Sequence, residues 1–151
     1  MEIDFMKLLR AVPSSSFKPI PGSAEFLKFM IESPNYEIAI ATGSWKLSAE
    51  HKLAAAGVPY EGVPIATCND CNVREDIMRK AEERAFDRYG RSQFDETLYF
   101  GDGIWDVRAT RNLKWRMVGI GEHIDHLKEL GAEHVFENFL SPAEILAAIE
   151  A

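Results

Sequence analysis

The stretch Thr97-Leu-Tyr-Phe-Gly-Asp-Gly-Ile-Trp-Asp106 decides the fold of this chain. Its apolar first half predicts a buried strand of a parallel sheet. We expect Gly101 and Gly103 to let the backbone turn tightly after this strand, so that Asp102 and Asp106 project beyond its carboxyl end. Open α/β sheets bind their ligands at that end of the strands. The stretch therefore predicts a metal or phosphate site.

The composition indicates one soluble domain with no nucleic-acid and no membrane partner. The chain has 151 residues, of which 46% are hydrophobic and 27% charged, and its net charge is −7. No basic run offsets this acidic excess, which argues against binding nucleic acid or an anionic membrane. No apolar run approaches the ~20 residues of a membrane helix, and residues 1–5 lack the pattern of a secretory signal. We predict a cytoplasmic protein.

Apolar runs alternate with amphipathic segments from about residue 20 onward. This alternation is typical of an α/β fold with a mainly parallel sheet. It predicts strands over 36–41, 63–67, 97–100, 116–120 and 135–136, and helices over 24–32, 45–56, 73–89, 104–112, 123–130 and from 142 to the end. Residues 1–11 form either a helix or a strand, and residues 12–17 form a loop.

Polar residues and glycine are expected to mark the helix ends. Ser44 is the predicted amino-terminal cap of the helix that follows it, and Asn72 with Glu75 has the spacing of a capping box. Ser141 precedes a proline at the first helical position, which predicts the start of the last helix. Gly90 is expected to end the helix over 73–89.

Three motifs, in this order, resemble those of the haloacid dehalogenase-like (HAD) hydrolase superfamily over residues 18–151. The strand 37–42 resembles the second family motif, and Arg74 resembles the basic residue of the third, with Lys80 as a weaker candidate. Residues 101–106 are similar to the fourth motif. The resemblance implies a Rossmann-like three-layer sandwich with a mainly parallel sheet.

The resemblance also implies which residues act. Thr42 and Arg74 are the implied catalytic residues, and together with Gly43 they are the implied phosphate-binding residues. Asp102 and Asp106 are the implied Mg²⁺ ligands. The implied substrate is a small phosphorylated molecule. Phosphoryl transfer depends mainly on positioning and charge neutralisation, which these residue types supply.

The first family motif, a strand that ends in Asp-x-Asp, has no counterpart before Thr42. Glu2 and Asp4 share its spacing, but no apolar strand precedes them. Residues 19–22 resemble the return of the family's chain from its cap to its core. We therefore expect residues 1–17 to be a remnant of the cap or an amino-terminal extension, and 18–151 to be the core, without its central first strand and its nucleophile.

Two consequences follow for activity and assembly. Mg²⁺ binding should be weak or absent, and the chain alone should be inactive as a phosphatase. The missing strand leaves a gap, which we expect to be closed by another chain in a homo-oligomer or by direct pairing of strands 37–42 and 97–100, ahead of insertion of residues 1–9. The alternative function is a non-catalytic binding or oligomerisation module on the same scaffold.

Each candidate site residue has a simpler structural interpretation. Asp106 is also placed to cap the helix that follows it, and Thr42 to cap the turn after its strand. Arg74 is also explained as a surface residue paired with nearby acids. Two carboxylates about 4 Å apart repel by roughly 4 kcal/mol at an effective dielectric constant of 20, so without a cation we expect Asp102 and Asp106 to separate.

Cys68 and Cys71 form a single Cys-x-x-Cys motif. A structural zinc site needs four ligands in matched pairs, and neither this motif nor the histidines have a second element at the required spacing. The histidines are His51, His123, His126 and His134. We expect two free thiols rather than a zinc site or a redox pair.

Overall fold

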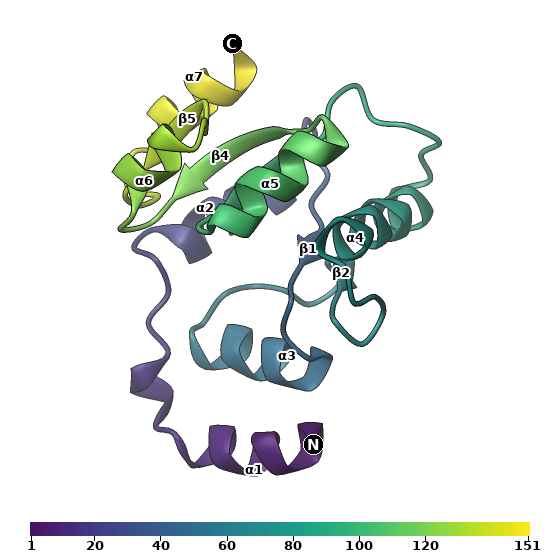
Figure 1. Cartoon of the computed structure of the whole chain (residues 1–151), viewed down its shortest axis with the longest axis vertical. Helices are drawn as coiled ribbons and strands as arrows, with labels where there is room; N and C mark the ends of the chain where they lie inside the picture. Colours follow the sequence, from purple (N-terminus) through teal and green to yellow (C-terminus); the bar gives the residue numbers. More distant parts are fainter. The chain divides into compact units, whose positions relative to one another are not determined.

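The computed structural model describes residues 1–151, and its helices and strands alternate along the chain (Figure 1). The elements are α1 (Glu2–Ala11), the 3₁₀ helix η1 (Ser14–Ser16), α2 (Ser23–Glu32), β1 (Ile40–Ala41), α3 (Lys46–Ala55), β2 (Ile65–Ala66), α4 (Arg74–Tyr89), β3 (Leu98–Gly101), α5 (Ile104–Leu113), β4 (Arg116–Ile120), α6 (Ile124–Glu129), β5 (His134–Phe136) and α7 (Pro142–Glu150). All strand pairs are parallel, so the predicted α/β class is confirmed. No helix has the length and apolar character required to cross a bilayer.

The chain divides into two compact units. The N-terminal unit comprises Met1–Pro19 and Ala24–Ser92, and the C-terminal unit comprises Ile20–Ser23 and Gln93–Ala151. β1 and β2 form the sheet of the first unit, and β3, β4 and β5 form the sheet of the second. The predicted boundary after residue 17 stays a prediction.

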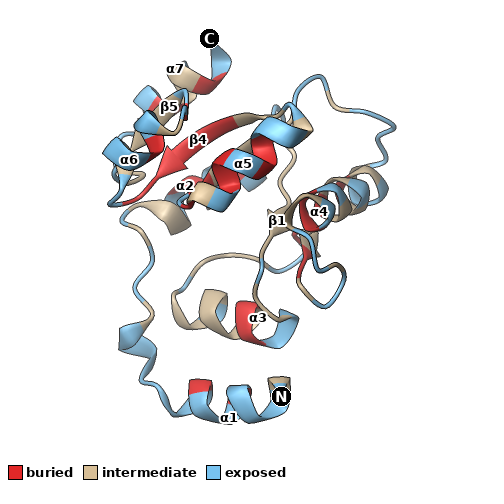
Figure 2. Ribbon diagram, in the orientation of Figure 1, coloured by how far each residue is buried: buried red, intermediate tan, exposed pale blue.

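The sheet of the C-terminal unit has the order β3-β4-β5, and its central strand β4 is buried on both faces. Met117 of β4 packs with Val107 of α5 and Leu127 of α6 on one face. Val118 and Ile120 alternate with Met117 along the strand and are also buried, as the red colour of β4 in Figure 2 shows. Because successive side chains of a strand point to opposite faces, the central strand of this unit is covered on both sides.

The sheet of the N-terminal unit consists of two short strands covered by α4. Ala66 of β2 forms a buried cluster with Ile77 and Ala81 of α4. The small alanine side chains let the helix approach the strands closely. α1 packs on α3 in the same unit, where the rings of Phe5 and Trp45 make an edge-to-face contact with centroids 5.5 Å apart.

The strand predicted over residues 36–41 is much shorter in the structure. Only Ile40 and Ala41 pair with β2, in register with Ile65 and Ala66. The backbone of Ile38 instead bonds to a side chain, because the Tyr89 hydroxyl donates to its carbonyl oxygen at 2.8 Å and accepts from its N–H at 3.3 Å. A hydroxyl from α4 therefore satisfies groups that a longer strand would have used.

Insertion of residues 1–9 as a strand, the least favoured way of closing the sheet, does not occur. β1 pairs with β2 within the first unit and β3 with β4 within the second, and direct pairing of the strands 37–42 and 97–100 stays a prediction. Residues 1–9 lie in a helix rather than an inserted strand, since Met6 and Leu9 are spaced to bury one face of α1. Closure by another chain stays a prediction.

Two predicted helix caps are also wrong. Val73, not Asn72, is the amino-terminal cap of α4, and no side chain bonds there. Trp45, not Ser44, occupies the corresponding position of α3. The predicted end of α4 is confirmed, because Gly90 adopts a left-handed conformation with φ of 65°.

Candidate functional site

The loop after β3 is organised around the carboxylate of Asp106. This side chain is 1% exposed, and its Oδ2 accepts hydrogen bonds from the backbone N–H of Asp102 at 3.2 Å and of Gly103 at 3.1 Å. Gly103 is the amino-terminal cap of α5. Asp106 therefore caps its own helix, in agreement with the simpler interpretation, and a negative charge at this end is favoured by the helix dipole.

The two glycines of this loop are required for space rather than for turning, which corrects the sequence-based expectation. Neither has a positive φ, and Gly103 is extended, with φ of −118°. A Cβ atom on residue 101 would lie 2.6 Å from Oδ2 of Asp106 and 2.8 Å from its Cβ. A Cβ atom on residue 103 would lie 2.2 Å from the ring of Trp105. A larger residue at position 101 would have to displace the buried Asp106 side chain, whereas one at position 103 would have to displace the exposed ring of Trp105.

Asp102 differs from Asp106 in its surroundings. Its side chain is exposed, and its Cβ lies 3.8 Å from the position of a Cβ on Gly121, which directly follows β4. The loop thus offers one carboxylate to solvent and holds the other against the backbone. A carboxylate has about four lone-pair positions, and both capping bonds of Asp106 are accepted by Oδ2.

Thr42 lies at the carboxyl end of β1. Its N–H donates to the carbonyl oxygen of Ala66 at 3.0 Å, and its Oγ1 accepts from the N–H of Ser44 at 3.2 Å. This is the turn-capping role of the simpler interpretation. A hydroxyl that accepts one bond keeps its own hydrogen as a donor, which suits it to an anion.

The structure brings Arg74 to the same loop. Arg74 is the first residue of α4, and its Nη1 lies 3.2 Å from the position of a Cβ on Gly43. Gly43 has no side chain, so the guanidinium approaches the loop backbone directly. Lys80, the weaker candidate, instead forms an ion pair with Glu83 at 3.0 Å.

The loop 67–71 after β2 and Glu2 of α1 contact the start of α3, a role that the sequence did not predict. Asn69 Oδ1 accepts from the N–H of Lys46 at 2.8 Å, and Glu2 Oε1 accepts from the N–H of Leu47 at 3.3 Å. These two side chains cap α3 in place of Ser44. No sequence signal identifies them, because the partners are 23 and 45 residues apart.

An ion pair between Arg84 and Asp70 fixes the loop. Nη2 and Nη1 of Arg84 donate to the two carboxylate oxygens of Asp70 at 2.6 and 2.9 Å, and Nη1 also donates to the carbonyl oxygen of Ile65. The hydrogen bond from Arg84 lowers the pKa of Asp70 below its ordinary value and outweighs the opposing effect of burial. The same bond raises the pKa of Arg84.

Comparison with known proteins places the chain in a family. The family of haloacid dehalogenase-like hydrolases matches residues 4–114, which is more than half of the sequence. The chain belongs to this family. The resemblance drawn from the sequence motifs is thus confirmed at the level of the family. No curated protein matched the chain.

Two solved structures share the fold. A hydrolase from Pseudomonas syringae is 29% identical with a TM-score of 0.71, and the match covers 87% of this chain and 61% of that protein. A conserved haloacid dehalogenase-like protein of unknown function from Agrobacterium tumefaciens strain C58 is 21% identical with a TM-score of 0.67, and the match covers 97% and 65%. The HAD-like chain therefore spans less than two thirds of either protein. The predicted Rossmann-like fold is confirmed.

Proposed function

We propose that this HAD-like chain is a phosphatase-type domain that binds the phosphate group of a small phosphorylated molecule. Thr42, Gly43 and Arg74 form the proposed phosphate site, and Asp102 and Asp106 the proposed Mg²⁺ site. The observation that carries the proposal is the contact of the Arg74 guanidinium with the loop at Gly43. The family match supports a hydrolase.

The chemistry of the N-terminal unit suits a phosphate. A planar guanidinium donates several hydrogen bonds in a geometry that matches phosphate oxygens. Thr42 adds a hydroxyl donor from the end of β1, and Gly43 is exposed, so an anion has access to the loop. All three groups lie at the carboxyl end of a parallel strand, where α/β folds bind ligands.

The chemistry of the C-terminal unit suits a weakly held magnesium ion. Asp102 provides an exposed carboxylate, and Asp106 a buried one. No group of three or more metal-ligating side chains is present in the chain. The ion would therefore keep several water ligands, as Mg²⁺ commonly does, and we expect millimolar rather than submicromolar affinity.

We further propose that these 151 residues hold phosphate without hydrolysing it. Covalent phosphoryl transfer in this family begins with attack by an Asp at the end of a strand, as the resemblance implies. The carboxylates before Thr42 do not follow a strand: they lie on α1, on α2 and in the loop before β1, where Glu37 pairs with Arg91 at 2.8 Å. These carboxylates are Glu2, Asp4, Glu25, Glu32 and Glu37.

Titration with inorganic phosphate, followed by calorimetry, tests the phosphate site. We expect Arg74→Gln to weaken binding by at least about tenfold, because a charge-assisted pair contributes about 1.5–3 kcal/mol. Lys80→Gln is the matched control, since Lys80 lies on the same helix but pairs with Glu83 instead of approaching the loop. Equal affinities in the two variants would refute the assignment of Arg74.

Magnesium titration and an activity assay test the second site and the proposed inactivity. We expect Asp102→Asn to abolish weak Mg²⁺ binding and Asp125→Asn, an exposed acid in the same unit, to leave it unchanged. Purified protein should not hydrolyse p-nitrophenyl phosphate above background. Submicromolar binding that survives Asp102→Asn would refute the metal site, and metal-dependent turnover lost in Asp102→Ala would refute the inactivity.

The second candidate function is a non-catalytic binding or oligomerisation module. Large apolar side chains are exposed along α1, which Figure 2 shows mostly in pale blue: Met1 is 92%, Ile3 70% and Leu8 72% exposed. Exposed apolar groups on one element are typical of contact surfaces. Sedimentation equilibrium showing a stable dimer, together with no phosphate binding, would favour this candidate.

A further inference from the structure

Cys68 and Cys71 lie in the turn that follows β2. The carbonyl oxygen of Thr67 accepts from the N–H of Asp70 at 3.0 Å and from the N–H of Cys71 at 3.4 Å. Residues three apart in such a turn have Cα atoms about 5 Å apart, from its rise and radius. Disulfides span Cα separations of about 4.4–6.8 Å, so a turn with this hydrogen bonding is compatible with a disulfide.

The two thiols also face the same neighbours. Cys68 and Cys71 both pack against the buried cluster of Ala66, Ile77 and Ala81. Both side chains are free and only partly buried. Two thiols on one side of a turn, both within reach of solvent, meet the requirements of access and proximity for thiol–disulfide exchange.

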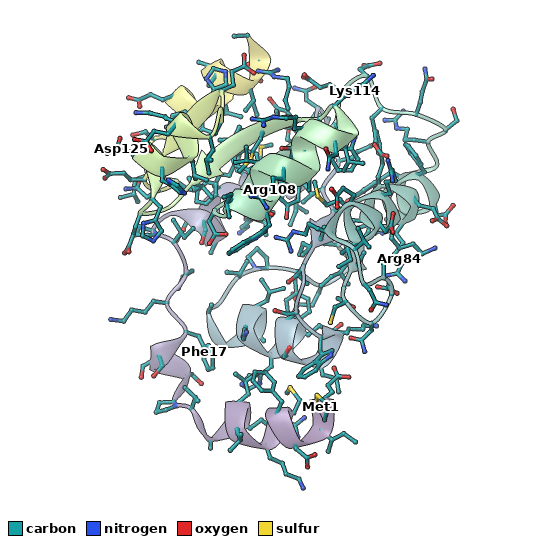
Figure 3. All side chains as sticks on the ribbon, in the orientation of Figure 1. Met1, Phe17, Arg84, Arg108, Lys114 and Asp125 are labelled. Atoms are coloured by element: carbon teal, nitrogen blue, oxygen red, sulfur yellow. The ribbon has the colours of Figure 1, made fainter.

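Residues other than the cysteines hold this turn in place. Asp70 accepts from the Thr67 N–H at 2.9 Å and from the guanidinium of Arg84, which is labelled on α4 in Figure 3. These bonds hold the turn in place without any contribution from the two thiols.

The thiols are free in the structure, as the sequence predicts. Contrary to the sequence-based expectation that they are not a redox pair, we propose that Cys68 and Cys71 form a reversible intrachain disulfide by exchange with a small-molecule disulfide. The thiolate of one cysteine attacks a sulfur of the small disulfide, forms a mixed disulfide and releases one small thiolate. The thiolate of the other cysteine then attacks the protein sulfur of this mixed disulfide and releases the second small thiolate. Two protein thiols are oxidised, the small disulfide is reduced to two thiols, and the two protons pass to solvent or to the released thiolates.

Hydrogen bonds connect this turn to the segment after β1, so disulfide formation should also affect that segment. The N–H of Cys68 donates to the carbonyl oxygen of Ser44 at 3.3 Å, and the side chain of Asn69 accepts from Lys46 N–H at 2.8 Å. Closing the disulfide restrains the turn that makes both bonds. The proposed disulfide does not rest on the proposed phosphate site, because the exchange needs only the two thiols, although Ser44 also donates to Oγ1 of Thr42 in that site.

Thiol titration and intact mass measurement in glutathione redox buffers test the proposal. We expect the wild-type chain to lose both thiols together, with a mass lower by two hydrogen atoms and no attached glutathione. Cys68→Ser and Cys71→Ser should each form a glutathione adduct instead. The second thiol acts at a high effective concentration. The wild-type chain should therefore be half-oxidised at about tenfold less glutathione disulfide than is needed to form half of the adduct in either single variant.

Amide hydrogen exchange of the oxidised and reduced forms provides a second measurement. We expect a changed exchange rate at Lys46 in the wild-type chain and no change in the double variant Cys68→Ser/Cys71→Ser, which can form neither a disulfide nor a glutathione adduct. Circular dichroism confirms that both single variants are folded. Glutathione adducts on both wild-type thiols, or disulfide-linked dimers as the main product, would overturn the proposal.

Discussion

The loops after β1 and β3 both follow a parallel strand and both carry candidate site residues, yet they are held in different ways. The loop after β3 is closed by its own residues, since Asp106 accepts bonds from residues three and four positions earlier. The loop after β1 depends on the distant Asn69 and Glu2 for the helix that follows it. Local bonds of the first kind are encoded in a short motif, whereas bonds of the second kind exist only after the chain has folded.

Replacing Gly101 and Gly43 with alanine should give the largest difference in stability between the two loops. A Cβ on Gly101 would meet Cβ and the carboxylate of Asp106, whereas one on Gly43 would meet only the end of the Arg74 side chain at 3.2 Å. We expect Gly101→Ala to lower the free energy of unfolding by about 3 kcal/mol, since overpacking and a displaced buried carboxylate both cost stability. Gly43→Ala should cost less than about 0.5 kcal/mol. Urea denaturation provides both values, and similar losses would break the comparison.

Replacing Asp106 or Asp102 with alanine should show which carboxylate stabilises the loop after β3. Asp106→Ala leaves the N–H groups of Asp102 and Gly103 without their acceptor, and we expect a loss of about 2–3 kcal/mol. Asp102→Ala removes an exposed side chain and should change stability by less than about 0.5 kcal/mol. Urea denaturation without Mg²⁺ measures both. A larger effect of Asp102→Ala would mean that Asp106 does not organise the loop.

Arg84→Gln should loosen the loop 67–71 in a pH-dependent way. We expect a loss of about 1–2 kcal/mol at pH 7, from the ion pair and the bond to the Ile65 carbonyl oxygen. The pKa of Asp70 is lowered in the folded protein, chiefly by the hydrogen bond from Arg84. The contribution of the pair is therefore complete above the ordinary Asp pKa of about 3.9 and is lost as the pH falls through the lowered value.

Denaturation of the wild-type chain and the Arg84→Gln variant between pH 7 and pH 3 tests this dependence. The difference in unfolding free energy should be constant down to about pH 5 and shrink below about pH 4. Lys80→Gln, which breaks the exposed pair with Glu83, is the control and should cost less than about 0.5 kcal/mol. A difference that grows as the pH falls would contradict the sign of the Asp70 shift.

The ends of two helices offer the smallest test. α4 ends at Gly90 with φ of 65°, and α5 ends at Lys114 with φ of 59°, the only non-glycine residue with a positive φ. Lys114→Gly should raise the unfolding free energy by about 0.5–1 kcal/mol, because glycine adopts this conformation without strain. Gly90→Ala should lower it by about 1 kcal/mol. Thermal denaturation measures both, and effects of the same sign would contradict this account.

The success of the sequence-based predictions follows the same division. The strand over 116–120 and the extent of α4 were predicted closely, because apolar spacing and a terminal glycine are local signals. The strand over 36–41 is shorter than predicted, because its apolar pattern does not indicate that the Tyr89 hydroxyl bonds to Ile38. Capping by Ser44 failed for a related reason, since α3 takes its caps from Asn69 and Glu2. Asn72 lies one residue before the cap position of α4, which Val73 occupies.

The sequence by itself determined the α/β alternation, the family and the residue types at Thr42, Arg74, Asp102 and Asp106, because these depend on periodicity and on short motifs. The tertiary structure decided what surrounds those residues. It placed the Arg74 guanidinium against Gly43, and Asn69 and Glu2 at the start of α3. It also packed both thiols against residues of α4. Such contacts depend on distances between residues that adjacent sequence does not constrain, so only the folded chain defines them.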